Sequence, residues 1–230
     1  IDGKQDLSVA TGGDLALTTG TVGGNAVLSS TGATSIDSLS VQGTLGADSV
    51  GAVTARVLAS GGAAALSSGS TLDVQELTVG SDLSADAVGT LSIAKADVTG
   101  NATVDGKADV VLGTANVGQA LVANAATTLS AASLNTGGNA TLTSGGNTTI
   151  GMIDGKQDVL ITTGSDLNLV TGTVGGNATL TSGGNTMIGT IDGKQDLSVA
   201  TGGDLALTTG TVGGNAVLSS TGATLSLIHI

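Results

Sequence analysis

The sequence predicts an all-β fold, a right-handed parallel β-helix (solenoid) of about twelve 19-residue triangular coils. Three observations predict it. The 230 residues include 39 Gly but no Phe, Trp, Tyr, Cys or Pro, residues 1–34 are identical to residues 191–224, and apolar positions recur with a 19-residue period. Such repetition is typical of solenoids, in which each unit packs only on its neighbours.

The 19-residue period comes from internal copies of the sequence. The segment Gly-Gly-Asn-Ala-Thr-Leu-Thr-Ser-Gly-Gly-Asn-Thr begins at 137 and again at 175. The two copies are 38 residues apart, and half of this separation is 19 residues. Units of 19 residues divide the chain into twelve without a gap, the first starting at Ile1 and the last at Gly210. The divergent middle units test this division, because no recent duplication makes them agree.

The apolar positions within the unit predict its strands. The seventh and ninth positions are apolar in all twelve units, and the seventeenth is apolar from Leu17 to Leu207. Positions two apart point to the same side of a strand. A second strand is therefore expected at positions fifteen and seventeen, and a weaker third at positions one and three, as in Leu39 and Val41. Three strands per unit describe one triangular turn.

Glycine, asparagine and aspartate mark the expected corners. The sixth position is Asn or Asp in nine of the twelve units, and Gly-Gly-Asn and Gly-Asp steps separate the strands. Because these residues tolerate positive φ, we expect them to turn the chain. The recurrence of Asp6, Asp158 and Asp196 at one position of the unit favours a structural role for these carboxylates.

The composition fits a narrow stacked core. Ala, Val, Leu and Ile supply nearly all of the 40% hydrophobic residues. Units mostly pair one large residue with one small residue, as in Ala26 with Leu28 and Leu45 with Ala47, so neighbouring layers interdigitate without aromatic side chains. At about 4.8 Å per coil, the stack is a rod about 55 Å long.

Charge and hydropathy exclude several classes of function. The net charge is −12, and the six basic residues are scattered singly. We therefore expect no nucleic-acid partner and no attraction to anionic membranes. No apolar run reaches the ~20 residues of a membrane helix, so no membrane insertion is expected. Ile1 opens the chain without a leader, which predicts an internal fragment, and the lack of Cys is compatible with cytosol or with a bacterial exterior.

The repeat resembles a known family. The segments Gly-Gly-Asn-Ala-Thr-Leu-Thr-Ser-Gly-Gly-Asn-Thr and Gly-Gly-Asp-Leu-Ala-Leu-Thr-Thr-Gly, on a 19-residue period, look like the repeat region of filamentous-haemagglutinin-like adhesins. The similarity covers nearly the whole chain. It implies a secreted or cell-surface bacterial exoprotein, exported by an outer-membrane two-partner secretion transporter, that attaches to host or neighbouring cells. It carries no catalytic residue, and the family's secretion domain is absent from this chain.

The last six residues do not follow the repeat. Ser226 falls at the seventeenth position, where every earlier unit is apolar. The segment 225–230 also resembles the translation of a transposon-end adapter used in sequencing libraries. We therefore predict a β-helical shaft over residues 1–224 and a non-native tail over residues 225–230.

The residue inventory argues against catalysis. His229 is the only histidine and lies in the tail, which removes His-based triads and His-rich metal sites. The Asp-Gly-Lys-Gln segments lack the glycine spacing and the Ser or Thr of a phosphate loop, and predict turns with a solvated Lys. Arg56 is the lone arginine, and no cluster of acids and bases is evident. We predict no enzyme, and no catalytic, cofactor-binding or metal-ligating residue.

Two surface patterns have the form of binding features. Thr141/Thr143 and Thr179/Thr181 form outward Thr-x-Thr pairs of the kind that matches ice or carbohydrate, but the coil between them keeps only Thr162. The sequons at Asn101, Asn139, Asn147 and Asn177 are expected products of Asn corners followed by Thr strands.

The sequence therefore predicts a non-enzymatic structural shaft of a large secreted or surface-exposed bacterial adhesin. Two alternatives stay open. A fragment of a β-helical carbohydrate-active enzyme would carry a face with three or more clustered acids and bases. An ice- or glycan-binding solenoid would carry Thr-x-Thr in consecutive coils of one flat face.

Overall fold

The computed structural model describes residues 1–229, which form two parallel β-sheets of 13 and 12 strands. The larger sheet contains the odd-numbered strands β1 (Asp2–Gly3), β3 (Leu15–Val22), β5 (Thr34–Val41), β7 (Val53–Ser60), β9 (Leu72–Val79), β11 (Leu91–Val98), β13 (Val110–Val117), β15 (Leu129–Thr136), β17 (Thr148–Gly155), β19 (Leu167–Val174), β21 (Thr186–Gly193), β23 (Leu205–Val212) and β25 (Thr224–His229). The smaller sheet contains β2 (Leu7–Thr11), β4 (Ala26–Ser30), β6 (Leu45–Ser49), β8 (Ala64–Ser68), β10 (Leu83–Ala87), β12 (Ala102–Gly106), β14 (Leu121–Ala125), β16 (Ala140–Ser144), β18 (Val159–Thr163), β20 (Ala178–Ser182), β22 (Leu197–Thr201) and β24 (Ala216–Ser220).

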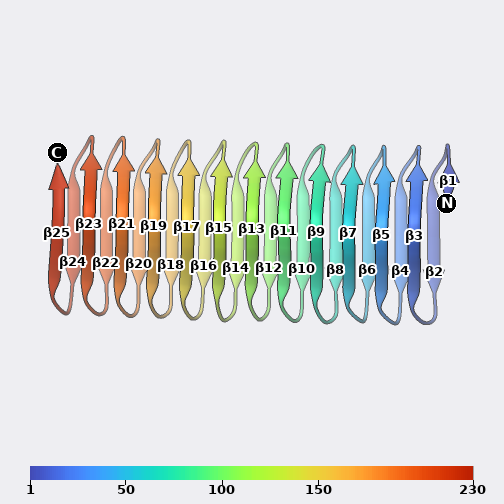
Figure 1. The fold of residues 1–230 in the computed structure, drawn as a ribbon, viewed down its shortest axis with the longest axis horizontal. Coiled ribbons are helices and arrows are strands. Elements are labelled where there is room, and N and C mark those ends of the chain that lie inside the picture. The colour runs from blue at the N-terminus through green and yellow to red at the C-terminus, as the bar shows by residue number, and fades with distance from the viewer. Residues whose placement is uncertain (230) are drawn as a thin grey trace.

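The two sheets lie face to face along a straight stack, with the termini at opposite ends (Figure 1). Each coil contributes one short strand and one long strand, and each strand pairs in parallel with its counterpart one coil away. Ala26 pairs with Leu45, for example, and Leu45 with Ala64, so each pairing follows the 19-residue period. The predicted parallel β-solenoid of about twelve 19-residue coils is confirmed.

The core lies between the sheets and consists of the predicted columns. Leu142 and Ile161, from the ninth position, are fully buried, and so is Ile150 from the seventeenth. Large and small residues stack on one another as expected, since Ala26 pairs with Leu45 and Leu28 with Ala47 across neighbouring strands. This alternation fills a narrow interior without aromatic rings.

Each coil has two strands, where we predicted three. In β5, both pairs of inward positions belong to one strand of eight residues, with Thr34 and Ile36 buried at its start and Leu39 and Val41 at its end. Between them Asp37 and Ser38 both lie away from the core, so inward residues there are three apart instead of two. The pairing with β3 also omits the position of Asp37. The strand bends at this point, which separates the two apolar pairs in sequence without ending the strand.

The corners do not use positive φ, contrary to our expectation, because no residue among those described adopts it. Glycine is required instead by the close approach of one coil to the next. A Cβ on Gly51 would lie 2.7 Å from the backbone oxygen of Gly32, and one on Gly23 would lie 2.7 Å from that of Lys4. Real Cβ atoms essentially never come closer than 3.0 Å to such atoms, so side chains are excluded where coils stack this tightly.

Asp and Asn side chains bind the corners of successive coils together. Just before the short strands, the carboxylate of Asp158 accepts a hydrogen bond from the backbone N–H of Asn177 at 2.7 Å, and the side-chain oxygen of Asn177 accepts one from the N–H of Asp196 at 3.3 Å. This confirms the structural role expected for the sixth-position acids. A second ladder that we did not predict precedes the long strands, where Asp166 and Asn185 act in the same way.

The core also contains hydroxyl groups that sequence analysis did not predict. Ser182 is buried and shares hydrogen bonds with Thr186 at 2.6 Å and with Thr201, in the next coil, at 2.8 Å. The trios Ser30/Thr34/Ser49 and Ser144/Thr148/Thr163 repeat this arrangement. Ser182 also donates to the carbonyl oxygen of Gly184. The trio therefore supplies hydrogen bonds to polar groups that the corner places inside an apolar stack.

The pairing changes near the C-terminus. Ser226 still pairs with Leu207, but the register then shifts, so that Gly210 pairs with Ile228. Leu225 and Leu227 are 76% and 57% exposed. These features place the break in the repeat within β25; the assignment of residues 225–230 to a non-native tail remains a prediction, and Ile230 lies outside the described residues.

Candidate functional site

The outer face of the long strands carries a row of charged side chains, which we call the charged row: Asp37, Arg56, Glu76, Lys95 and Asp97. They come from β5, β7, β9 and β11, one coil after another. Arg56 Nε lies 2.5 Å from Asp37 Oδ1, and Lys95 Nζ lies 3.0 Å from Glu76 Oε1 and 3.2 Å from Asp97 Oδ2. Asp37, Arg56 and Lys95 are exposed, and Glu76 and Asp97 are half-buried.

The charged row corrects our statement that no cluster of acids and bases is evident. Four of its members, Asp37, Arg56, Glu76 and Lys95, lie at the two outward positions created by the bend in each long strand, and Asp97 follows Lys95 by two residues on β11. Asp37 and Arg56 are one 19-residue period apart, as are Glu76 and Lys95, so parallel stacking brings each pair into contact. The outward positions of the repeat carry the sequence signal for these pairs, which the apolar positions do not contain.

Hydrogen bonds and ion pairs lower the pKa of two carboxyl groups in the charged row, Asp37 and Asp97. The hydrogen bond from Arg56 lowers the pKa of Asp37. The pKa of Asp97 is lowered first by the hydrogen bond from the Asn116 amide and then by Lys95. A general acid in glycoside hydrolysis needs a raised pKa. The pKa values of Asp37 and Asp97 are shifted in the opposite direction, so these two carboxylates act as fixed charges and hydrogen-bond acceptors.

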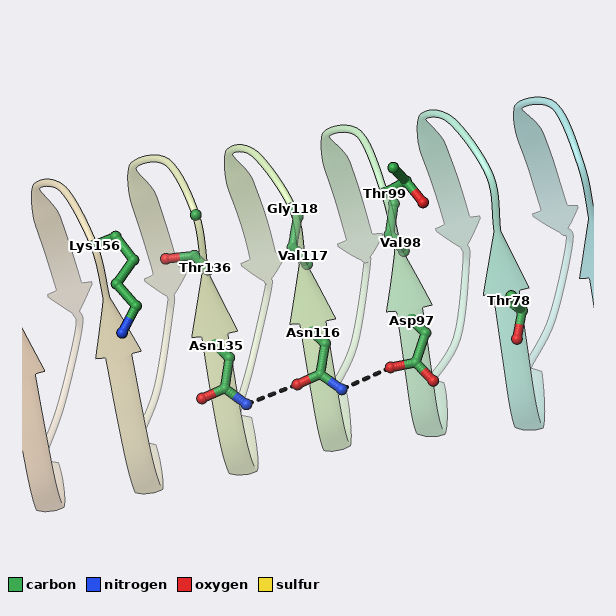
Figure 2. A pocket seen from close by; sticks show the side chains of 11 residues that line it. Thr78, Asp97, Val98, Thr99, Asn116, Val117, Gly118, Asn135, Thr136 and Lys156 are labelled. Atoms are coloured by element: carbon green, nitrogen blue, oxygen red, sulfur yellow. Dashed lines mark hydrogen bonds between the residues drawn. The ribbon is translucent and has the colours of Figure 1, made fainter.

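A polar ladder continues from Asp97 along the same face (Figure 2). Asn116 donates its side-chain amide to Asp97 Oδ1 at 2.6 Å, and Asn135 donates to Asn116 Oδ1 at 2.7 Å. These three residues line a shallow hollow on the long-strand sheet, together with Thr78 and Lys156 among others. Figure 2 shows the three side chains side by side on neighbouring strands.

The ladder ends at Asp154, which pairs with Asn135 in the next coil. The side-chain nitrogen of Asn135 donates to Asn116 in the preceding coil. The side-chain oxygen of Asn135 therefore faces the opposite way, toward the strand that contains Asp154. Asp154 Oδ2 accepts a hydrogen bond from Lys156 at 2.6 Å, but Asp154 Oδ1 is buried and has no hydrogen-bond partner among the described residues. The ladder of amide donors therefore ends at Asn135, and the paired residue Asp154 keeps one oxygen without a partner among the described residues.

The Asp-Gly-Lys-Gln segments form solvated turns, as predicted. Lys156 and Lys194 are 64% and 61% exposed, and each pairs with the Asp two residues before it, Lys156 with Asp154 and Lys194 with Asp192.

The threonine pairs lie on the outer face of the short strands. Thr143, Thr162 and Thr181 are exposed and occupy one column, since Thr143 pairs with Thr162 and Thr162 with Thr181. In the neighbouring column Leu160 separates Thr141 from Thr179. The hydroxyl array is thus interrupted, as the sequence indicated.

The sequon asparagines occupy the corner ladders. Asn101 and Asn139 accept backbone hydrogen bonds from Ala120 and Asp158 through their side-chain oxygens, and Asn147 does the same for Asp166. Each of these side chains therefore has a structural partner.

Residues 1–229 contain no group of three or more His, Cys, Asp or Glu side chains arranged to hold a metal ion. Over the same residues, no helix has the length and apolar character needed to cross a membrane. Comparison with known proteins found no match to a family model, to a curated protein or to a solved structure.

Proposed function

We propose that this chain is a structural shaft, a rigid spacer within a large secreted or surface-exposed bacterial adhesin. One observation supports the proposal of a shaft. The 12-stranded sheet keeps a single 19-residue register through every coil. No insertion interrupts the stack over the described residues (Figure 1). Outward side chains also bond to their counterparts one coil away, as Asn116 does to Asp97 and Lys95 to Glu76. Regular stacking transmits stiffness along the whole rod.

The resemblance of the repeat to filamentous-haemagglutinin-like adhesins extends the proposal to an adhesin. On this basis the protein is exported by an outer-membrane two-partner secretion transporter and attaches to host or neighbouring cells. The right-handed winding and triangular cross-section of that family's shafts belong to the same proposal. The paired charges of the charged row favour a spacer over an enzyme, because the hydrogen bonds that lower the pKa of Asp37 and of Asp97 disfavour protonation of these two carboxylates.

Surface labelling tests the adhesin role. Antibodies raised against the 230-residue chain are applied to intact cells of the source organism and to lysed cells. Labelling of intact cells is expected. Labelling that requires lysis would contradict a surface-exposed shaft, while leaving the solenoid itself unaffected.

A glycan-binding or glycan-processing surface is the second candidate, and the charged row with its adjoining polar ladder favours it. Five charged groups and two amides lie together on one face. The test incubates the chain with a panel of polysaccharides and measures both retention and release of reducing ends. Binding or cleavage that is lost in Asn116→Ala and kept in Thr143→Ala, on the opposite sheet, would establish this function in place of a pure spacer.

A further inference from the structure

A copy of the first coil occurs inside the stack, where its packing against a preceding coil can be seen. Residues 1–34 are identical to residues 191–224. The coil that begins at Ile191 therefore has the same sequence as the coil that begins at Ile1, but it lies inside the stack. Its neighbour on the N-terminal side, residues 172–190, shows which surface this sequence accepts.

The contacts between these two coils are well defined. Strand β20 pairs with β22, which places Ala178 beside Leu197, Leu180 beside Val199 and Ser182 beside Thr201. In this setting Leu197 and Val199 are each 1% exposed.

The last coil presents nearly the same inward residues as the coil of residues 172–190. At the third, seventh, ninth, eleventh and fifteenth positions the two coils have the same residues, namely Val212, Ala216, Leu218, Ser220 and Thr224 in the last coil and Val174, Ala178, Leu180, Ser182 and Thr186 in the earlier one. Only the seventeenth position differs, with Ser226 in place of Ile188. The C-terminal face of the stack thus copies a surface that accepts this coil sequence.

Both end faces of the described stack leave apolar side chains incompletely covered. Leu7, Val9 and Leu15 at one end, and Ala216 and Leu218 at the other, are only partly buried against the core. The strand edges beyond β2 and β24 have no partner strand in the described chain. Apolar side chains and open strand edges of matching shape favour association.

We propose that the isolated 230-residue chain self-associates, with the first coil of a second copy stacked head to tail on the last coil of the first copy. Strand β24 of one copy pairs with β2 of the next, as β20 pairs with β22. Ala216 then lies against Leu7, Leu218 against Val9 and Ser220 against Thr11, which reproduces the internal interface.

The end of β25 opposes this stacking. The backbones of Ile228 and His229 pair with Gly210 and Thr211. In the internal interface the equivalent positions, Gly172 and Thr173, pair with Ile191 and Asp192. Ile1 and Asp2 of a second copy therefore compete with residues 228–229 for the same strand edge, and removal of residues 228–230 should release it.

Sedimentation velocity of the 230-residue chain and of a chain ending at Leu227 tests the proposal. We expect linear oligomers from both, with the shorter chain associating at about tenfold lower concentration and both responding to added salt, which screens the repulsion of the −12 net charge. In the shorter chain, Leu218→Glu should abolish association and Ser219→Glu, of equal charge on the outer face, should preserve it. Monomers throughout, or equal effects of the two substitutions, would overturn the proposal.

Cysteine cross-linking tests the direction of stacking, since the chain has no Cys of its own. Thr181 pairs with Ala200 in the internal interface, so Ser219 should meet Ala10 of the next copy. Neighbouring strands lie about 4.8 Å apart, within disulfide range. Oxidation of the shorter chain carrying both Ala10→Cys and Ser219→Cys should give a ladder of oligomers. Equally efficient dimers from Ala10→Cys alone would show head-to-head contact and overturn the proposal.

Discussion

Asn116 donates its side-chain amide to Asp97 of the preceding coil at 2.6 Å, and this contact joins the charged row to the polar ladder. The two residues are one 19-residue period apart, so the repeat itself brings them together. The same spacing accounts for the corner ladders and the buried hydroxyl trios. In this molecule hydrogen bonds between identical positions of successive coils hold the polar groups, while the alternating aliphatic columns fill the core.

The end of the polar ladder yields the first prediction. Asp154→Asn should supply a donor to the oxygen of Asn135 and remove the unpartnered carboxylate oxygen, at the loss of one exposed ion pair with Lys156. Asp192→Asn is the matched control, because Asp192 has the same Asp-Gly-Lys-Gln context but pairs with Thr173 and Thr211. Urea unfolding should show Asp154→Asn to be about 1 kcal/mol more stabilising than Asp192→Asn. Equal effects at the two sites would refute the ladder's direction.

The second prediction concerns the core columns. Leu142→Asp or Ile161→Asp introduces a charge at a fully buried position and should cost several kcal/mol or unfold the local coils. Thr143→Asp, one residue away on the outer face, should be nearly neutral. Chemical denaturation followed by circular dichroism compares them, and similar losses from inner and outer variants would contradict the assigned register.

Sequence periodicity identified these columns because burial of aliphatic side chains is a strong constraint at every coil. It predicted the solenoid, the coil length and the inward positions of Leu142 and Ile161. It divided the long strand in two because the bend at Asp37 and Ser38 changes the spacing of inward residues from two to three. It assigned glycine to positive φ, whereas close stacking of coils is what excludes side chains at Gly51. The charged row was missed because Asp37 and Arg56, and likewise Glu76 and Lys95, meet across coils.

The third prediction concerns the buried hydroxyl trios. Ser182→Ala removes the hydroxyl that links Thr186 to Thr201 and should cost about 1–3 kcal/mol. The double variant Ser182→Ala/Thr186→Val replaces both hydroxyls of that coil with apolar groups, as in the coil that has Ala87 and Leu91 at these positions. It should be less destabilised than the single variant in urea unfolding, because fewer buried polar groups lose a partner. If the loss of stability in the double variant equals the sum of the losses in Ser182→Ala and Thr186→Val, the two hydroxyls act independently and the account is contradicted.

The fourth prediction concerns acid stability. Hydrogen bonds from Thr127 and Thr128 lower the pKa of Asp109 in the folded chain. Arg56 lowers the pKa of Asp37. A carboxyl whose folded pKa lies below its unfolded value binds its proton more readily when unfolded, so its contribution is complete above about pH 4 and is lost as the pH falls through the lowered pKa. Urea midpoints measured from pH 7 to pH 2 should fall in that acid range, and Asp109→Asn should reduce the fall. An unchanged acid slope in Asp109→Asn would contradict the account of this carboxyl.

The central claim is that the chain is a stack of interchangeable 19-residue coils, and the length of the rod tests it most directly. Deletion of residues 153–190 removes two whole coils and joins Met152 to Ile191, which begins the same Ile-Asp-Gly-Lys-Gln-Asp sequence as Ile153. Small-angle X-ray scattering should show the deleted chain still folded, with its long dimension shorter by about 10 Å and its cross-section unchanged. A changed cross-section, or loss of the fold on removal of two complete coils, would contradict the stacked-coil account.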